Sequence, residues 1–318
     1  MWLYAARRVL FTIPIGLGVT IICFALIYLA PGDPVQSLLP PDATANDIAQ
    51  LKHYYGLDKP IPVQYILWLG HALTGDLGIS IQTNRPVTDE VWRALGNTVS
   101  IATISAVLAM IIALGLGIVA ATNIGGWADR LATAIAVFGV SVPTFWLAVV
   151  LVIVFAVQLG VLPATGMGSK GSNTFSWFEW SEARYAVLPI VAMTLTPLGI
   201  LMRTTRASLA DILSQDFIQT LRAKGLSETA VIRHAIANAL PQILAMFGLQ
   251  LGYLIGGSIL IETIFTWPGT GFLLNKAILT RDIPLLQGTI LVLAMAFVGI
   301  NLIVDLIQTL VDPRIKRI

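Results

Sequence analysis

The sequence predicts an all-α polytopic membrane protein with six transmembrane helices. Of its 318 residues, 56% are apolar and only 11% are charged, a balance too apolar for a soluble domain of this length. Uncharged runs also recur along the chain, and about 20 such residues are enough for a helix to cross a bilayer. These runs cover residues 9–30, 97–124, 131–160, 186–202, 242–261 and 285–304.

The first run follows Arg7 and Arg8 and is long enough to cross a bilayer. It is too long for the apolar part of a cleaved signal peptide, and it ends at Pro31 instead of a small-residue cleavage site. We therefore expect a retained first span.

The chain divides into three parts at the polar boundaries of these runs. Residues 1–30 form the N-terminal segment and the first span, residues 31–96 form a polar segment, and residues 97–318 form a core with five spans. Within the core, residues 203–241 form a polar interval between the fourth and fifth spans. The fourth span is the shortest and contains two prolines, which transmembrane helices tolerate because neighbouring groups satisfy the freed backbone.

The distribution of Lys and Arg predicts that both termini lie in the cytoplasm. With the N-terminus inside, eleven of these residues fall on the cytoplasmic side, in the two terminal flanks, at Arg130 and in residues 203–241. Because cytoplasmic loops carry the excess of positive charge, residues 31–96 are expected outside. The short loops on that outer side carry only Lys170, Arg184, Lys276 and Arg281.

The polar interval at residues 203–241 has the pattern of a helical hairpin. Its first half places apolar residues three to five positions apart among polar ones, as in an amphipathic helix. These apolar residues are Ile212, Leu213, Phe217 and Leu221. Gly225 then offers a helix stop, and Ser227 suits the start of a second helix. Because the apolar faces must bury against something, the hairpin is a candidate for docking a partner protein.

Several classes of function are excluded by what the sequence lacks. It contains no Gly-Lys dipeptide and so no P-loop, which means that the chain is not expected to hydrolyse ATP by itself. The three histidines and the single Cys23 form no metal or catalytic motif. No basic run with interleaved aromatic residues suggests nucleic acid. We therefore expect no catalytic residue, no metal site and no cofactor.

Two features within the spans carry structural predictions. Gly248, Gly252 and Gly256 recur every four residues on one face of the fifth span, which permits close helix packing. Asp305 lies at the end of the sixth run, with Asn301 one turn before it, and its role is left open.

Motifs spread over the whole chain resemble those of one family. They are Phe24-Ala-Leu-Ile-Tyr-Leu-Ala-Pro31-Gly-Asp-Pro34, Gly75-Asp-Leu-Gly-Ile-Ser80, Leu162-Pro-Ala-Thr-Gly166, Arg203-Thr-Thr-Arg-Ala-Ser208, Arg222-Ala-Lys-Gly-Leu-Ser227 with Asn238-Ala-Leu-Pro241, Glu262-Thr-Ile-Phe-Thr-Trp-Pro-Gly-Thr-Gly271 and Asp312-Pro-Arg314. On these motifs the chain is similar to the permease subunits of the dipeptide, oligopeptide and nickel family of bacterial ABC importers. The resemblance implies a type I importer fold, with several spans in the inner membrane.

The resemblance also implies that the central hairpin seats in an ATPase subunit and transmits its closure. The residues that carry this coupling loop here are Phe217, Gln219, Leu221, Arg222, Ala223, Lys224, Gly225, Leu226, Ser227 and Pro241. Gln219 stands where the wider class has a Glu, and a Gln cannot form the ion pair that a Glu could make. Docking is therefore expected to depend on shape, on apolar contact and on the neighbouring bases.

The implied partners are a homologous sister permease, one or two ABC ATPase subunits, an extracytoplasmic solute-binding protein and the lipid bilayer. The expected substrate is a short peptide, namely a dipeptide or an oligopeptide. Nickel, glutathione, opines and oligosaccharides are also carried by this family, and the sequence does not separate them.

The turn that follows the fifth span is expected to lie outside, as a gate or as a docking site for the binding protein. Its candidate residues are Glu262, Trp267, Pro268, Gly269 and Gly271. A rigid Pro flanked by permissive glycines suits such an element. A tight turn that only anchors an interfacial Trp is the alternative.

Two other classes of function were weighed against the importer. A secondary transporter or channel would need no docking hairpin and is usually marked by charges within the spans or by repeated halves. A membrane-embedded enzyme would need a catalytic constellation at the depth of the spans, and the sequence shows none.

Overall fold

The structure is a computed structural model that describes residues 2–29, 44, 58–168, 171 and 175–311. Within these residues every regular element is a helix, and a single antiparallel bridge joins Ile79 and Pro86. Most of the expected outer segment up to residue 57, and the terminal residues 312–318, lie outside the described part. The elements are α1 (Trp2–Leu29), α3 (Ile61–Leu73), α4 (Val87–Thr122), α5 (Trp127–Ser141), α6 (Thr144–Leu151), the π-helix η2 (Val152–Gln158), α7 (Trp180–Leu213), α8 (Asp216–Ala223), α9 (Glu228–Gly257), α10 (Ile259–Ile264), α11 (Thr270–Thr280) and α12 (Ile283–Val311).

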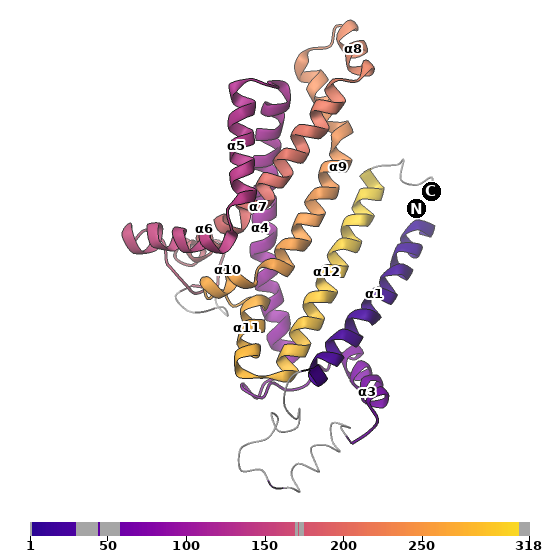
Figure 1. The fold of residues 1–318 in the computed structure, drawn as a ribbon, viewed down its shortest axis with the longest axis vertical. Helices are drawn as coiled ribbons and strands as arrows, with labels where there is room; N and C mark the ends of the chain where they lie inside the picture. Colours follow the sequence, from indigo (N-terminus) through magenta and orange to yellow (C-terminus); the bar gives the residue numbers. More distant parts are fainter. Residues whose placement is uncertain (1, 30–43, 45–57, 169–170, 172–174, 312–318) are drawn as a thin grey trace.

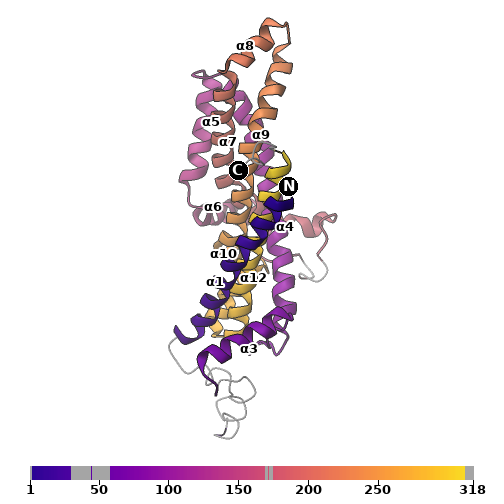
Figure 2. The same ribbon diagram turned by 90° about the vertical axis from the view of Figure 1, so that its right-hand side faces the viewer.

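Helix α7 forms the centre of the molecule and packs against α4, α5, α6 and α9 (Figures 1 and 2). It continues without a break through Pro189 and Pro197, so both prolines are tolerated as expected. Where it meets α4 the two backbones approach closely, because a Cβ added at Gly117 would lie 2.6 Å from the Thr205 side chain. The buried face of α4 is accordingly made of small residues at helical spacing, including Ala102, Ala106, Ala109, Ala113, Gly117 and Ala120.

Helices α9 and α12 pack together, and two of the three predicted packing glycines lie at their contact. A Cβ added at Gly248 would overlap the Val304 side chain, and one at Gly252 would lie 3.1 Å from the Phe297 ring. Gly256 differs, because a Cβ added there would meet no described atom within 4 Å. This third glycine therefore faces open space in the isolated chain.

Within the described residues, four helices are long and apolar enough to cross a membrane, namely α4, α7, α9 and the part of α12 up to Ile307. Helix α1 has 28 residues and carries a shorter described apolar stretch, Leu10–Ala25. A fifth candidate is a bent pair of helices. The count of six spans therefore stays a prediction.

The uninterrupted third span expected at residues 131–160 is replaced by that bent pair, in which Trp127–Ser141 and Thr144–Gln158 meet at 98°. The break falls at Val142 and Pro143, and Val142 takes the extended conformation that a residue preceding proline prefers (φ −80°, ψ 123°). Figure 1 shows α6 lying across the direction of the other long helices.

The polar interval at residues 203–241 is built mainly from the ends of the two neighbouring spans. Helix α7 extends to Leu213, and α9 begins at Glu228 and runs through Pro241 to Gly257. The expected first amphipathic helix is therefore split, because Ile212 and Leu213 belong to α7 and only residues 216–223 form α8. The second expected helix is the start of the fifth span itself.

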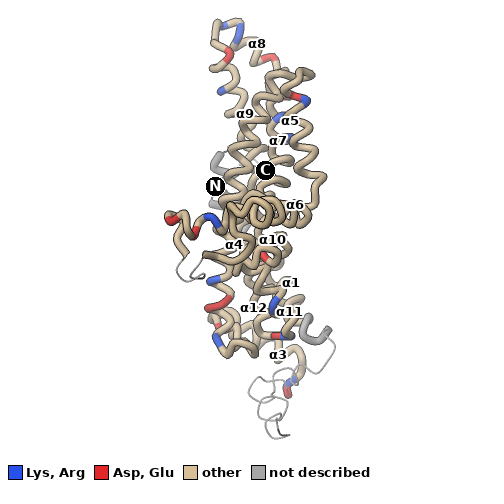
Figure 3. Tube along the Cα trace, turned by 90° about the vertical axis from the view of Figure 1, so that its left-hand side faces the viewer, with Lys and Arg blue, Asp and Glu red and all other residues tan. Residues whose placement is uncertain are grey.

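Charged residues are concentrated toward the two ends of the molecule and beside the start of α7, with few along the middle of the helices (Figure 3). The end that carries α8 and the end that carries α3 and α11 lie far apart along the long axis (Figure 1). An apolar middle between two charged ends is the arrangement expected of a protein that spans a bilayer.

Candidate functional site

The α8–α9 hairpin, residues 216–240, projects at one end of the long axis (Figures 1 and 2). Its turn depends on Gly225, whose φ of 80° lies in the left-handed region that favours glycine. The Leu226 N–H donates to the Leu221 carbonyl at 3.3 Å, and the Gly225 N–H donates to the Arg222 carbonyl at 2.9 Å. This pairing closes a helix at a left-handed glycine, so the direction of the turn is fixed by the backbone.

Helix α9 starts at a cap on the other side of the same turn. The Ser227 hydroxyl accepts a hydrogen bond from the Ala230 N–H at 3.4 Å, as expected of a helix N-cap. Arg222 on α8 donates two hydrogen bonds to the Glu228 carboxylate, at 2.8 and 3.1 Å. These bonds raise the pKa of the Arg222 guanidinium above its ordinary value. They tie the two arms of the hairpin together at the surface.

The apolar core of the hairpin is centred on Ile218, which is fully buried. Ile218 packs in one cluster with residues of α4, α7 and α9, and the half-buried Leu221 and Leu226 pack against that cluster. The other buried members are Ala121, Leu209, Val231, Ala235, Ala239 and Ile243. The hairpin is therefore joined to the helices beneath it by an apolar core and not only by its chain ends.

Phe217, next to this core, leaves 37% of its surface exposed. It is the large apolar side chain that α8 presents outward, and Gln219, Arg222, Ala223 and Lys224 are exposed with it. The sequence assigned Phe217 and Leu221 to one apolar face, whereas the structure puts Leu221 in the hairpin core and leaves Phe217 outside. An exposed aromatic ring among basic side chains is a surface suited to docking another protein.

An ion pair that the sequence did not suggest, between a buried Asp129 and a half-buried Arg206, joins α5 to α7. The Arg206 guanidinium donates to both carboxylate oxygens of Asp129, at 2.5 and 2.8 Å, and Asp129 is 5% exposed. Asp129 also accepts from the Gly125 N–H at 2.9 Å, so it fixes the turn between α4 and α5. No sequence motif marked this pair, because its members are 77 residues apart.

Toward the opposite end, below the middle of the long axis, the fully buried Glu262 on α10 holds the start of α11 (Figure 1). Its carboxylate accepts from the backbone N–H groups of Gly271 and Phe272, at 2.7 and 3.1 Å, and from the Thr98 hydroxyl of α4 at 2.7 Å. Gly269, the N-cap residue of α11, makes no side-chain capping bond, and Glu262 supplies that cap instead. Burial raises the pKa of the Glu262 carboxyl above its usual range, although these hydrogen bonds oppose the shift.

Trp267 and Pro268 join the same segment to α4 by two further hydrogen bonds. The fully buried Trp267 donates its indole N–H to the Asn97 carbonyl at 3.2 Å, and the Asn97 side chain donates to the Pro268 carbonyl at 2.9 Å. The Trp267 ring also meets Phe175 edge-on, with centroids 5.6 Å apart. Trp267 is therefore an internal anchor of the turn in this conformation.

The two glycines of this turn allow close approach. A Cβ added at Gly269 would lie 2.5 Å from the Thr98 hydroxyl, and one at Gly271 would lie 2.5 Å from the Ile259 Cα. We call residues 262–272 together with Asn97 and Thr98 the clamp. The turn is evident in the sequence, whereas its partners on α4 are not.

Asp282, between α11 and α12, makes a second buried junction at this end. It accepts from the Leu285 N–H at 3.1 Å, which caps α12, and from the Ser80 hydroxyl at 2.6 Å. The Gln82 N–H also donates to it at 3.2 Å. A buried carboxylate with three donors ties the loop before α4 to the start of α12. No group of His, Cys, Asp and Glu in the described residues could hold a metal ion.

Comparison with known proteins identifies the family. Residues 113–317 match the family described as "Binding-protein-dependent transport system inner membrane component", and residues 1–102 match the N-terminal part of such membrane components. The chain is 42% identical to the dipeptide transport system permease protein DppB of Alkalihalophilus pseudofirmus, covering 99% of this chain and 100% of that protein. It is 37% identical to the glutathione transport system permease protein GsiC of Escherichia coli, covering 98% of each.

A solved structure has the same fold. The MetNI methionine ABC transporter, in an inward-facing conformation, aligns with a TM-score of 0.57 and 18% identity, covering 70% of this chain and 96% of that chain. At this identity the likeness concerns the fold alone, which is that of a type I ABC importer. The family match covers most of the chain and identifies the family. This protein belongs to the binding-protein-dependent transport system inner membrane components, the permease subunits of ABC importers.

Proposed function

We propose that this permease and a homologous sister permease form a pathway for short peptides that a solute-binding protein delivers. The observation that carries the peptide assignment is the 42% identity to a dipeptide permease over essentially the full length of both chains. The 37% identity to a glutathione permease points to a related solute, because glutathione is itself a small peptide. Nickel, opines and oligosaccharides remain the alternatives within the family.

We propose further that the α8–α9 hairpin is the docking site for a separate ATPase subunit. The exposed Phe217 supplies an apolar contact, and the basic side chains of Arg222 and Lys224 are exposed on the same hairpin. The Gly225 turn and the buried Ile218 give the hairpin a fixed shape. A rigid hairpin is suited to transmitting movement of the ATPase to the spans because it does not deform under load.

The clamp is proposed as the external gate or binding-protein docking element. Its position between α10 and α11, on the side of the molecule away from the hairpin, supports this role (Figure 1). Because Trp267 is buried, contact with a binding protein would involve the exposed surface around the turn and not the indole ring.

The substrate proposal is tested with the assembled importer in proteoliposomes, supplied with its binding protein and ATP. We expect uptake of radiolabelled dialanine that depends on both additions. Glutathione and Ni²⁺ are measured in parallel. Uptake of Ni²⁺ without either peptide would refute the proposal, and uptake without ATP would identify a secondary transporter instead.

The proposed topology places both termini and the hairpin in the cytoplasm, and residues 31–96 and the clamp outside. A reporter fused after Lys52 or Gly171 is expected outside, and one fused after Gly225 or at Ile318 is expected inside, because the Lys and Arg excess lies on the hairpin side. Alkaline phosphatase, which is active only outside, is measured against green fluorescent protein, which fluoresces inside. Phosphatase activity at Gly225 would contradict this orientation.

A further inference from the structure

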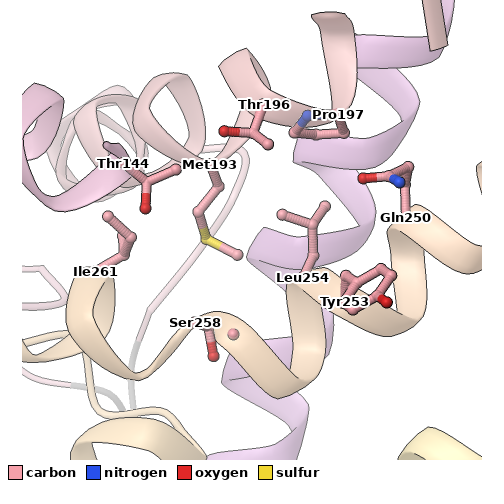
Figure 4. A pocket seen from close by; sticks show the side chains of 10 residues that line it. Thr144, Met193, Thr196, Pro197, Gln250, Tyr253, Leu254, Ser258 and Ile261 are labelled. Atoms are coloured by element: carbon pink, nitrogen blue, oxygen red, sulfur yellow. The ribbon is translucent and has the colours of Figure 1, made fainter. Parts of the chain in front are cut away.

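A small pocket lies where α9 ends at Gly257 and α10 begins at Ile259. It has a volume of about 140 Å³ and is bounded by α6, α7, α9 and α10 (Figure 4). Figure 1 places the α9–α10 junction near the middle of the long axis, away from both charged ends. Breaks in transmembrane helices at such a depth are found where transporters bind their solutes.

The walls of this pocket carry neutral polar groups. Among the described residues that line it, none is charged. A lining without ions does not suit recognition of a bare metal ion, and it does suit hydrogen bonding to a neutral solute group. The polar members are Thr144, Thr196, Gln250, Tyr253 and Ser258.

Gln250 is a buried polar side chain of this lining with a single weak hydrogen bond within the part of the chain that the structure describes. It is only 6% exposed, yet in the described residues its sole hydrogen bond runs from its amide nitrogen to the Met246 sulfur, at 3.9 Å. A thioether is a weak acceptor, and the carboxamide oxygen accepts no hydrogen bond from a described residue. The carboxamide oxygen is not among the fully buried unpaired atoms of the described residues, so it borders the open space of the pocket, where a ligand can pair with it.

The pocket is open toward the exposed side of α9. Tyr253 on its rim is 68% exposed, and a Cβ added at Gly257 would meet no described atom within 4 Å. Leu249 and Leu260 continue this exposed face along α9 and α10. A solute that passed along this face would reach Gln250 without crossing the core.

We infer that this pocket is a subsite for a peptide amide, with the Gln250 carboxamide as its recognition group. A carboxamide offers an acceptor oxygen and donor hydrogens, which are the complement of a peptide C=O and N–H. Whole-ligand pockets usually measure about 300–1,000 Å³, so this smaller volume holds one residue of the solute and leaves the rest to other walls. The subsite deepens the proposed peptide transport and depends on it.

The test uses the complete importer in proteoliposomes with saturating loaded binding protein. Gln250→Leu keeps the side-chain size and removes both hydrogen-bonding groups. We expect the number of dialanine molecules taken up per ATP hydrolysed to fall about tenfold, while ATP hydrolysis and complex assembly stay near wild type. Gln242→Leu, at an exposed position on the same helix, is the matched control and should leave that ratio unchanged.

The outcomes separate the subsite from the proposed substrate. An unchanged ratio in Gln250→Leu, or an equal fall in Gln242→Leu, would overturn the subsite. If the wild-type importer carries glutathione but not dialanine, the dipeptide assignment fails, and a fall in glutathione uptake by Gln250→Leu still supports the subsite. If it carries only Ni²⁺, which has no amide, both proposals fall.

Discussion

Replacing Phe217 with Asp is expected to abolish solute uptake while the permease remains in the membrane at normal abundance. Phe217 lies outside the buried cluster around Ile218, so the hairpin keeps that core in the variant, and docking would bury the 37% of its surface that is exposed. Burying the 37% of the side chain that is exposed contributes roughly 0.5–1 kcal/mol, or about two- to fivefold in affinity, and a carboxylate in its place adds the larger cost of desolvating a charge. The measurement is co-purification of the ATPase subunits together with uptake.

Two further variants test the same docking role, one expected to disrupt it and one expected to be mild. Gly225→Val should give the same loss, because a β-branched residue at φ 80° costs at least about 1–2 kcal/mol and would redirect the turn. Gln219→Ala, also exposed on α8, should be mild because no ion pair is lost there. Leu221→Asp is not equivalent, since it places a charge in the hairpin core. Normal uptake by Phe217→Asp with the ATPase still bound would refute the docking role.

The second large effect is expected at Glu262. Glu262→Ala removes the acceptor for the Gly271 and Phe272 N–H groups and for Thr98, whose hydroxyl can still pair with Thr270. Each buried donor left unpaired costs roughly 1–3 kcal/mol, and the cavity adds to this cost. We expect the apparent melting temperature of the detergent-solubilised complex to fall by at least about 5 °C.

Glu262→Gln is the matched control for this experiment. Its amide oxygen can accept from the α11 N–H groups, and its amide nitrogen can donate to the Thr98 hydroxyl, so the junction keeps most of its hydrogen bonds. Burial already favours the neutral form of the Glu262 carboxyl, which makes a neutral replacement still milder. Equal melting temperatures for Glu262→Ala and wild type, by fluorescence-detected size-exclusion chromatography, would show that the clamp does not stabilise this end.

The membrane class and the hairpin turn could be predicted because local chemistry determines them. Apolar runs of bilayer length need no partner to be recognised, and Gly225 with Ser227 carries its own stop and start signals. The same local signals failed at Pro143. Pro189 and Pro197 lie within an intact helix, whereas Pro143 begins a new one after a 98° bend. Helix α7 stays continuous where α4, α5, α6 and α9 pack around it, and a sequence alone does not reveal that enclosure.

The partners of the candidate site could not be predicted for a related reason. Thr98 and Glu262 are 164 residues apart, and Asp129 and Arg206 are 77 apart. Such pairs form only when tertiary packing brings their helices together. The sequence placed Phe217 and Leu221 on one apolar face for docking and did not show which of them the hairpin core takes up, because that core also draws on residues of α4 and α7.

Helix α9 runs without a break from the hairpin to the pocket, so a movement of the hairpin can be transmitted along it. Helix α9 contacts α12 at Gly248 and Gly252, which lie roughly 30–36 Å along the helix from its start and about 8–14 Å from its end, at 1.5 Å per residue. A rod supported at that contact is a lever with unequal arms. A push that tilts the hairpin would move the pocket end in the opposite direction by roughly a third of the distance, with correspondingly greater force. A large movement of the hairpin would thus become a small, forceful change in width at the Gly257 end of the pocket, while Gln250, which lies between the two contact glycines, would hardly move.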